Sequence, residues 1–185
     1  MRGSGLFRWT LAGLAVAALA LGGCGGSDEG DGPGGGGAPA KNADFLFSDL
    51  DACGLSQPAE REAALGEAAA TTDQKNGAAS RGCQATAASD KAYLIYLLTQ
   101  TPVPAPQYYD EVRKEADGPD VKDISGLGEK AFSSASAGSI SVQALAKNYV
   151  LDVSVMYYQD ADRPADTGPT IDRLKVLTEQ IIGRL

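Results

Sequence analysis

The sequence predicts an α+β fold in which an antiparallel sheet packs against helices. Two observations favour strands. Residues 93–99 (YLIYLLT) form a short apolar run rich in aromatic and branched side chains, and residues 139–158 hold two alternating apolar segments around Lys147-Asn148. A third observation favours a terminal helix, because apolar side chains recur at three- and four-residue steps between residues 170 and 185. Helices interleaved with antiparallel strands are typical of an α+β sandwich.

The elements before the first apolar run are predicted from capping and turn signals. Ser56 can cap a helix that has Pro58 in its first turn and ends at Gly66. Residues 77–82 are expected to form a loop, and a strand is expected around Cys83.

The elements after that run follow from prolines, glycines and polarity. Residues 101–106 (TPVPAP) are expected to be irregular, because three prolines prevent regular pairing. Residues 108–116 predict a short helix, residues 126–128 (GLG) a turn before a strand, and residues 159–169 a polar loop.

The N-terminal residues have the pattern of an export signal. Arg2 and Arg8 precede an apolar run, Leu11–Leu21, that is much shorter than the roughly 20 residues needed to span a bilayer as a helix. The run ends in Leu21-Gly22-Gly23-Cys24, which resembles the lipobox of bacterial lipoproteins. That resemblance implies that residues 1–23 are a lipoprotein signal peptide and that Cys24 becomes the acylated, mature N-terminus. Two or more acyl chains hold a protein durably on a membrane.

Two further regions follow the signal. Residues 24–41 contain the lipidated cysteine and a Gly-rich, acidic stretch that cannot bury enough apolar surface to offset the entropy of ordering it. We therefore expect a disordered tether with a typical reach of about 20–25 Å. Residues 42–185 are long enough for one core and are expected to form a single globular α+β domain.

Composition excludes several classes of function. The chain has 16 Lys and Arg against 24 Asp and Glu and no His. The acidic balance argues against nucleic-acid binding, which requires a basic surface. The absence of His argues against His-dependent hydrolases, the usual zinc sites and haem sites. We expect no cofactor, no metal site and no catalytic residue.

Two cysteines, Cys53 and Cys83, lie outside the lipobox. Export would place them in an oxidising compartment, where two cysteines most simply form a disulfide. The alternatives are a redox-active pair, which usually has its cysteines much closer in sequence, and a thiolate metal site without His. The spacing and the compartment favour the structural disulfide.

Three segments together resemble a family of actinobacterial secreted lipoproteins classed as a domain of unknown function. They are Cys53-Gly54-Leu55-Ser56 leading into a helix, Cys83 at the head of a strand, and Gly126–Ala131 (GLGEKA) followed by a hairpin and a terminal amphipathic helix. The resemblance spans residues 45–185. It implies that Cys53 and Cys83 pair, that the fold is an α/β sandwich similar to that of the PsbP and Mog1 proteins, and that there is no catalytic residue.

Four other patterns have both a chemical and a structural interpretation. Gly126–Gly128 lacks the third glycine of a dinucleotide-binding loop, so a turn is favoured. Asp160 and Asp162 are too few for an EF-hand calcium loop. Ser89-Asp90-Lys91 has no Ser-x-x-Lys nucleophile before it. The seven tyrosines suit core and edge packing, and some could line a groove for an apolar or sugar-like ligand.

These observations predict a lipoprotein on the extracytoplasmic face of the cell membrane. Its body is expected to be non-enzymatic and to bind an envelope protein or a small ligand through residues that the sequence does not identify. The alternative is a cell-wall hydrolase that uses two carboxylates. It predicts a cleft with two acids within roughly 5–10 Å of each other.

Overall fold

The computed structural model describes residues 50–77, 79–100, 103–116 and 120–185. The expected signal peptide, Cys24 and the tether to residue 41 lie outside the described residues, as do residues 42–49 of the expected body. None of the described helices combines the length and the hydropathy needed to cross a bilayer.

Helices flank a run of strands in the described residues. In chain order the elements are η1 (Ala52–Leu55, a 3-10 helix), α1 (Pro58–Leu65), β1 (Ala69–Asn76), β2 (Ser80–Ala87), β3 (Ala92–Thr99), α2 (Ala105–Glu115), β4 (Lys122–Ile124), β5 (Lys130–Ala135), β6 (Ser139–Ala146), β7 (Tyr149–Tyr157), η2 (Asp160–Asp162, a 3-10 helix) and α3 (Gly168–Arg184).

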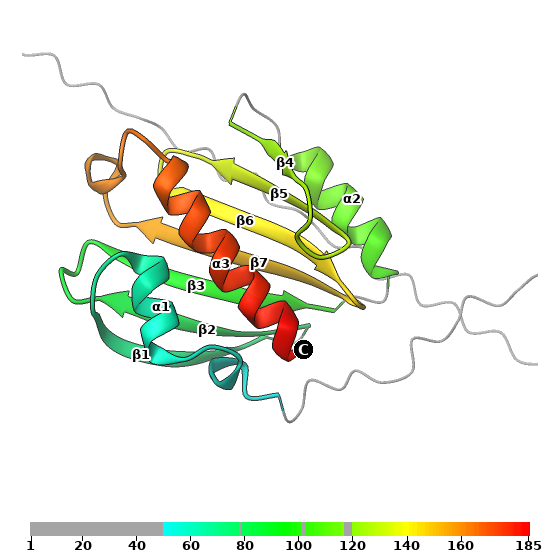
Figure 1. Ribbon diagram of the computed structural model, residues 1–185, viewed down its shortest axis with the longest axis horizontal. Coiled ribbons are helices and arrows are strands. Elements are labelled where there is room, and N and C mark those ends of the chain that lie inside the picture. Colours follow the sequence, from blue (N-terminus) through cyan, green and yellow to red (C-terminus); the bar gives the residue numbers. More distant parts are fainter. Residues whose placement is uncertain (1–49, 78, 101–102, 117–119) are drawn as a thin grey trace, which may run out of the picture. The chain divides into compact units, whose positions relative to one another are not determined.

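The strands form one antiparallel sheet in the order β1-β2-β3-β7-β6-β5-β4 (Figure 1). Strands β1 to β3 and strands β4 to β7 are two consecutive meanders. They meet where β3 pairs with β7, from Ala92 opposite Tyr157 to Thr99 opposite Val150. The predicted α+β class is confirmed.

Helices α1 and α3 cover the face of the sheet that is turned toward the viewer in Figure 1. Alternation along β3 directs Leu94, Tyr96 and Leu98 into this layer, and all three are fully buried. Helix α3 contributes an apolar stripe at three- and four-residue steps that includes Leu174 and Ile181. The main core therefore lies between these two helices and the middle of the sheet.

Helix α2 covers part of the opposite face. Tyr109 of α2 packs edge-on against Phe132 of β5, with ring centroids 5.7 Å apart. Leu145 and Val150, which are paired across β6 and β7, complete this second, smaller core. One sheet is thus covered by helices on both faces, and the two helical layers have separate apolar clusters.

The helix predicted after Ser56 is confirmed, but its cap is not Ser56. Gln57 is the N-cap, and it exchanges hydrogen bonds with Glu60 in a capping box. Ser56 is buried instead and bonds to the core. The helix ends at Leu65 because Gly66 adopts a left-handed conformation with φ of 84°.

Two predicted irregular segments are shorter than expected. Strand β2 begins at Ser80, so the loop predicted over residues 77–82 is wrong for its second half. Ser80 pairs with Thr99 of β3, and Arg81 and Gly82 are paired on both sides. Helix α2 begins at Ala105, so residues 101–106 are not irregular throughout. Pro104 is the N-cap, and Pro106 lies in the first turn, where a helix needs no N–H donor.

The hairpin predicted around Lys147-Asn148 is confirmed, with β6 and β7 joined by these two residues. Lys147 takes a positive φ of 55°, as two-residue hairpin turns require. The terminal helix is also confirmed, although α3 begins two residues before Thr170. Within the predicted loop of residues 159–169, the short η2 helix forms.

Candidate functional site

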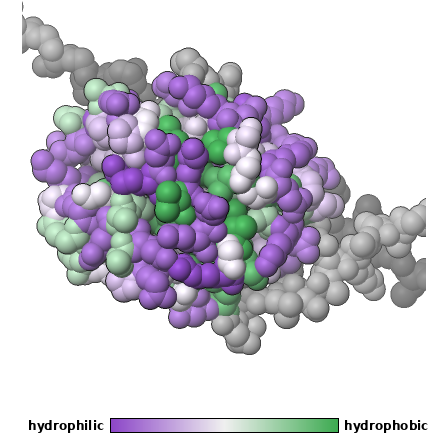
Figure 2. Space-filling view, in the orientation of Figure 1, coloured by the Kyte–Doolittle hydropathy of each residue, from purple (hydrophilic) through white to green (hydrophobic). Residues whose placement is uncertain are grey.

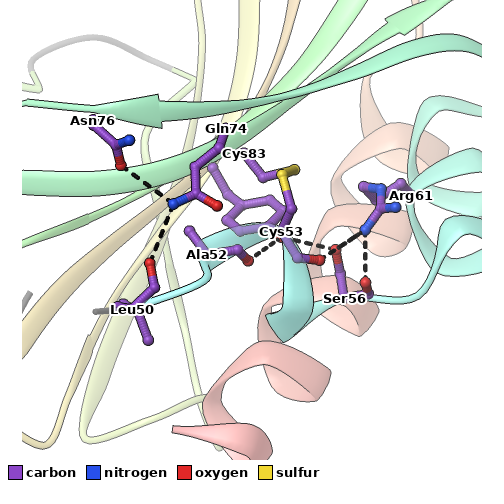
Figure 3. Close-up of a disulfide and its surroundings, with 9 residues drawn as sticks. Leu50, Ala52, Cys53, Ser56, Arg61, Gln74, Asn76 and Cys83 are labelled. Carbon is purple, nitrogen blue, oxygen red and sulfur yellow. Dashed lines mark hydrogen bonds between the residues drawn. A yellow bond between two sulfur atoms is a disulfide. The ribbon is translucent and has the colours of Figure 1, made fainter. Parts of the chain in front are cut away.

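The Cys53–Cys83 disulfide ties η1 to β2 (Figure 3). The two Cα atoms are 4.9 Å apart, and Cys83 is almost fully buried. The bond closes a loop that contains α1 and β1. This confirms the pairing favoured by the sequence, and it consumes both thiols that a redox or metal site would have used.

A buried chain of hydrogen bonds lies beside the disulfide (Figure 3). Arg61 Nη1 donates to the Ser56 carbonyl at 2.6 Å, to Ser56 Oγ at 2.8 Å and to the Cys53 carbonyl at 3.1 Å. Tyr96 Oη donates to the Ala52 carbonyl at 2.7 Å. The Ser56 hydroxyl, 2.8 Å from Tyr96 Oη, must therefore donate to Tyr96. Burial raises the pKa of Tyr96, which keeps the phenol neutral and able to donate.

An apolar groove of about 370 Å³ lies between α1 and α3. Ala59 and Ala63 are one turn apart on α1, and their small side chains leave space that Val176 of α3, which is 56% exposed, borders from the other side. The volume is within the range of small-molecule sites, roughly 300–1,000 Å³. Figure 2 shows hydrophobic surface between hydrophilic side chains over the middle of this face.

An ion pair borders this groove at Glu60. The guanidinium of Arg184 binds both oxygens of the Glu60 carboxylate, at 2.6 and 2.7 Å. This contact lowers the pKa of Glu60 and raises the pKa of Arg184. Glu60 is therefore anionic and already occupied by a cation, so it is not available as a general acid near neutral pH.

Arg173 also lines the groove, and its charge is not neutralised by the described residues. Its Nε donates to the Ala64 carbonyl at 3.4 Å and its Nη2 donates to Thr170 Oγ1 at 3.1 Å. It forms no ion pair with any described carboxylate. The guanidinium lies over Gly66, where a cation also favours the C-terminal end of α1. Three of its five N–H donors bond to none of the described residues.

A second pocket, of about 480 Å³, lies where α2 meets β4 and β5. It contains two carboxylates, Asp110 and Asp123, as the hydrolase alternative requires. Each is bound by a cation: Lys130 Nζ lies 2.8 Å from Asp110, and Arg113 Nε lies 2.9 Å from Asp123. The pocket also includes Tyr109, whose pKa is raised to about 12 by burial. Both carboxylates in this pocket are thus paired with a basic side chain.

One carboxylate with a raised pKa, Asp152, lies on the face of the sheet that α2 partly covers. Gln143 Nε2 donates to it at 3.1 Å, and the Ser154 hydroxyl donates to its other oxygen. Burial raises the pKa of Asp152, and the bond from Ser154 opposes that effect. Its cross-strand neighbours are Gln143 and Leu97, so neither residue opposite it is a second acid. The geometry is that of a carboxylate held in place by neutral donors.

The tyrosines lie in several different parts of the fold. Tyr96 is in the main core, Tyr109 packs under α2, and Tyr93 contacts Tyr158 with ring centroids 5.5 Å apart. Tyr157 packs against the main core. These positions agree with the core and edge packing predicted for most of the tyrosines, and Tyr109 is the one tyrosine that lines either of the two pockets described above.

The remaining sequence patterns are turns. Gly126 and Gly128 both have positive φ, and a Cβ at Gly128 would lie 2.5 Å from the Leu145 carbonyl oxygen, so close packing rather than a phosphate requires this glycine. Ser89 bonds to Glu67 in the turn before β3.

The two acids of η2 do not form a cation site with other ligands. Asp162 pairs with Lys91 at 3.5 Å. No group of three or more potential metal ligands occurs within the described part of the chain.

Sequence patterns did not reveal the groove. Alanines at 59 and 63 have the i, i+4 spacing of one helix face, but a helix of alanine and glutamate also suits a solvent-exposed position. Arg173 and Ala63 are 110 positions apart, and only the packing of α1 against α3 brings them together. Comparisons with protein-family models, with curated proteins and with solved structures found no match to this chain.

Proposed function

We propose that this chain is a membrane-anchored, extracytoplasmic lipoprotein whose folded body binds a small ligand without catalysing a reaction. Cys24 would be the lipidated residue, and residues 25–41 the tether. The disulfide between Cys53 and Cys83 supports export, because such bonds persist in oxidising compartments. The resemblance of residues 45–185 to actinobacterial lipoproteins leads to the same proposal.

The α1–α3 groove is the proposed binding site, and its chemistry defines the ligand. The observation that carries the proposal is the combination of an apolar lining with Arg173, a cation that no described carboxylate neutralises. An apolar body would lie along Ala59, Ala63 and Val176. A carboxylate or phosphate would accept hydrogen bonds from the guanidinium. The ligand class is therefore an amphipathic anion.

We favour ligand binding over hydrolysis because each candidate acid is already paired with a cation. In the pocket that holds Asp110 and Asp123, each carboxylate already accepts a bond from a lysine or an arginine. Glu60 in the groove is likewise bound by Arg184. A general acid needs a raised pKa and a free position beside the scissile bond, which none of these three arrangements supports.

Photolabelling of the full chain in membrane vesicles tests the ligand class. The probes are dodecanoate with a diazirine and the matching dodecanol, followed by peptide mapping. We expect the acid to label α1 and α3 more than the alcohol does. Ala63→Phe, which fills the groove from an exposed position, should abolish this labelling. Arg173→Gln should remove the preference for the acid.

Matched variants away from the groove are the controls. Ala88→Phe enlarges an exposed alanine in the turn between β2 and β3, and Arg163→Gln removes an arginine that does not line the groove. Neither should change the labelling. Labelling outside α1 and α3, or labelling that survives Ala63→Phe, would contradict the proposed site.

Acylation is tested separately by Cys24→Ala in cells given labelled fatty acid. We expect uncleaved precursor without label. Label retained by this variant would show that Cys24 is not the lipidated residue, without bearing on the groove.

A further inference from the structure

Among the described residues, the longer edge of the sheet is β1, which pairs on one side only. Strands β1 and β4 lie at the two edges of the sheet (Figure 1). Strand β4 has three residues, whereas β1 extends over Ala69–Asn76 and its side chains are largely exposed. Edge strands present unpaired N–H and C=O groups, and proteins usually protect them by shortness, proline, bulges, charged side chains or covering elements. Strand β1 contains no proline, its irregularity is confined to the end between Ala69 and Thr71, and its charged residues, Asp73 and Lys75, are of opposite sign. Its backbone can therefore accept another strand.

Strand β1 has one acidic and one basic residue, Asp73 and Lys75, and neither lies opposite a residue of the other charge on β2. Asp73 lies opposite Gln84 and Lys75 lies opposite Gly82 in the register with β2. Neither forms an ion pair with the described residues. They are two residues apart, so both side chains are on the same face of the strand.

These two charges are complementary to a second copy of the same strand. When two copies of a strand pair antiparallel about a two-fold axis, odd-numbered residues lie opposite odd-numbered residues and even-numbered residues opposite even-numbered ones. With the axis at Gln74, Asp73 lies opposite Lys75 of the second copy, and Lys75 lies opposite Asp73. With the axis at Asp73 or at Lys75, like charges lie directly opposite each other, which is destabilising. Charge therefore selects one register.

We propose that β1 pairs antiparallel with β1 of a second copy, centred on Gln74, so that the two sheets become continuous. The paired stretch is Thr72–Asn76. It lies beyond the irregularity between Ala69 and Thr71, where the register with β2 shifts and the edge is least regular. Two symmetric Asp73–Lys75 contacts fix this register, and the backbone groups of both edges are satisfied together.

Charge reversal tests the register on the full chain purified in mild detergent, with sedimentation as the measurement. The wild type should show concentration-dependent dimers. Asp73→Lys alone places Lys opposite Lys, and Lys75→Asp alone places Asp opposite Asp, so each should raise the dimer dissociation constant by about tenfold. Mixing the two variants places Lys opposite Asp at both contacts and should restore dimers. Because both positions are exposed or partly exposed, folding should be unchanged.

Cysteine pairs test the same geometry independently. Asp73→Cys and Lys75→Cys, produced as two distinguishable chains and mixed, should form a disulfide, because directly opposite residues have Cα atoms about 4.5–5.5 Å apart. Either variant alone, or a mixture of Thr71→Cys with Lys75→Cys, is out of register by two residues and should not. These side chains are on the face away from the Cys53–Cys83 bond, since Gln74, between them, is opposite Cys83.

Three results would overturn the proposal. The wild-type chain could remain monomeric at every concentration reached. Its dimers could be insensitive to both charge reversals. The mixture of Asp73→Cys and Lys75→Cys could cross-link no better than either variant alone.

Discussion

The β1–β2 side of the sheet and the β4–β5 side differ in what holds a helix against the strands. At β1 and β2, η1 and α1 are fixed by a disulfide and by the Arg61–Ser56–Tyr96 hydrogen bonds. At β4 and β5, α2 is held by the Tyr109–Phe132 contact and by exposed ion pairs such as Lys130–Asp110. Exposed ion pairs contribute little, so aromatic burial must stabilise the α2 side.

This difference follows from the side chains available. Strand β1 is polar and β2 supplies mainly alanine and cysteine to the core, so little apolar area is buried there. Where burial is small, a covalent bond and satisfied buried hydrogen bonds replace it. Where a phenylalanine and a tyrosine are available, packing is sufficient.

The largest expected effect is the loss of aromatic packing under α2. Phe132→Ala should lower the free energy of unfolding by about 3–5 kcal/mol, because Phe132 is fully buried and a cavity would remain. Urea unfolding followed by circular dichroism measures it. Phe132→Leu is the matched control and should cost clearly less. A cost below about 1 kcal/mol for Phe132→Ala would mean that the ion pairs hold α2 after all.

Removal of the disulfide should have the next largest effect. Cys53→Ala with Cys83→Ala should lower the free energy of unfolding by about 3–4 kcal/mol, from the entropy of the opened loop in the unfolded chain. Denaturant midpoints with and without reductant measure it. Reductant should have no effect on the double variant, and it should destabilise Phe132→Ala as much as the wild type, since the two sites are independent. Unequal effects would show that the two sides are coupled.

A smaller effect is expected for the buried hydroxyl. Tyr96→Phe should cost about 1–2 kcal/mol, because the Ala52 carbonyl and the Ser56 hydroxyl each lose a buried partner. Tyr93→Phe, on the opposite face of the same strand, is the control and should be nearly neutral. Thermal and denaturant unfolding of the two variants compare them directly. Equal losses of stability for the two variants would show that the hydrogen bonds of Tyr96 do not stabilise this side of the sheet.

The smallest effect is a pH dependence. The folded-state pKa of Asp152 is raised above its unfolded value, so the folded state is penalised when Asp152 ionises. Stability from this group is fully present below the unfolded pKa, about 4, and is lost as pH rises through the folded pKa. Relative to Asp152→Asn, the wild type should gain stability on acidification from neutral pH toward pH 4. Unfolding measured across this interval should show the difference; parallel profiles would contradict it.

The pKa of Glu60 is shifted in the opposite direction, so its effect on stability has the opposite pH dependence. Its pKa is lowered by Arg184, so its contribution is present above the unfolded pKa and is lost as pH falls through the folded pKa. On acidification the wild type should therefore lose stability relative to Glu60→Gln, which is the reverse of its expected change relative to Asp152→Asn.

The parts of the fold with strong apolar periodicity were predictable, and the polar parts were not. Residues 93–99, the hairpin around Lys147-Asn148 and the terminal helix carry their own patterns, and the structure confirms all three. Strand β1 was not predicted, because its exposed Thr, Asp, Gln and Lys side chains have no alternation. Its strand conformation depends on pairing with β2, which is a tertiary contact.

The disulfide could be predicted from the sequence, whereas the α1–α3 groove could not. Cys53 and Cys83, 30 residues apart in a chain whose N-terminal residues predict export, already favoured a structural disulfide. The groove depends on how far apart α1 and α3 lie, and its free charge depends on Arg173 forming no ion pair with a described carboxylate. Those properties belong to the packed structure, since no spacing in the sequence relates position 173 to position 63.

The pairing of β3 with β7 joins two consecutive parts of the chain, each of which contains its own strands. The first ends with β3 at Thr99, and the second begins with α2 at Ala105; each piece contains strands that are neighbours in sequence and in space. A break in the connection between them would separate no strand from its hairpin partner. The molecule is thus suited to fragment complementation, in which the two halves, produced separately, reassemble through one eight-residue strand pairing and the contact of α1 with α3.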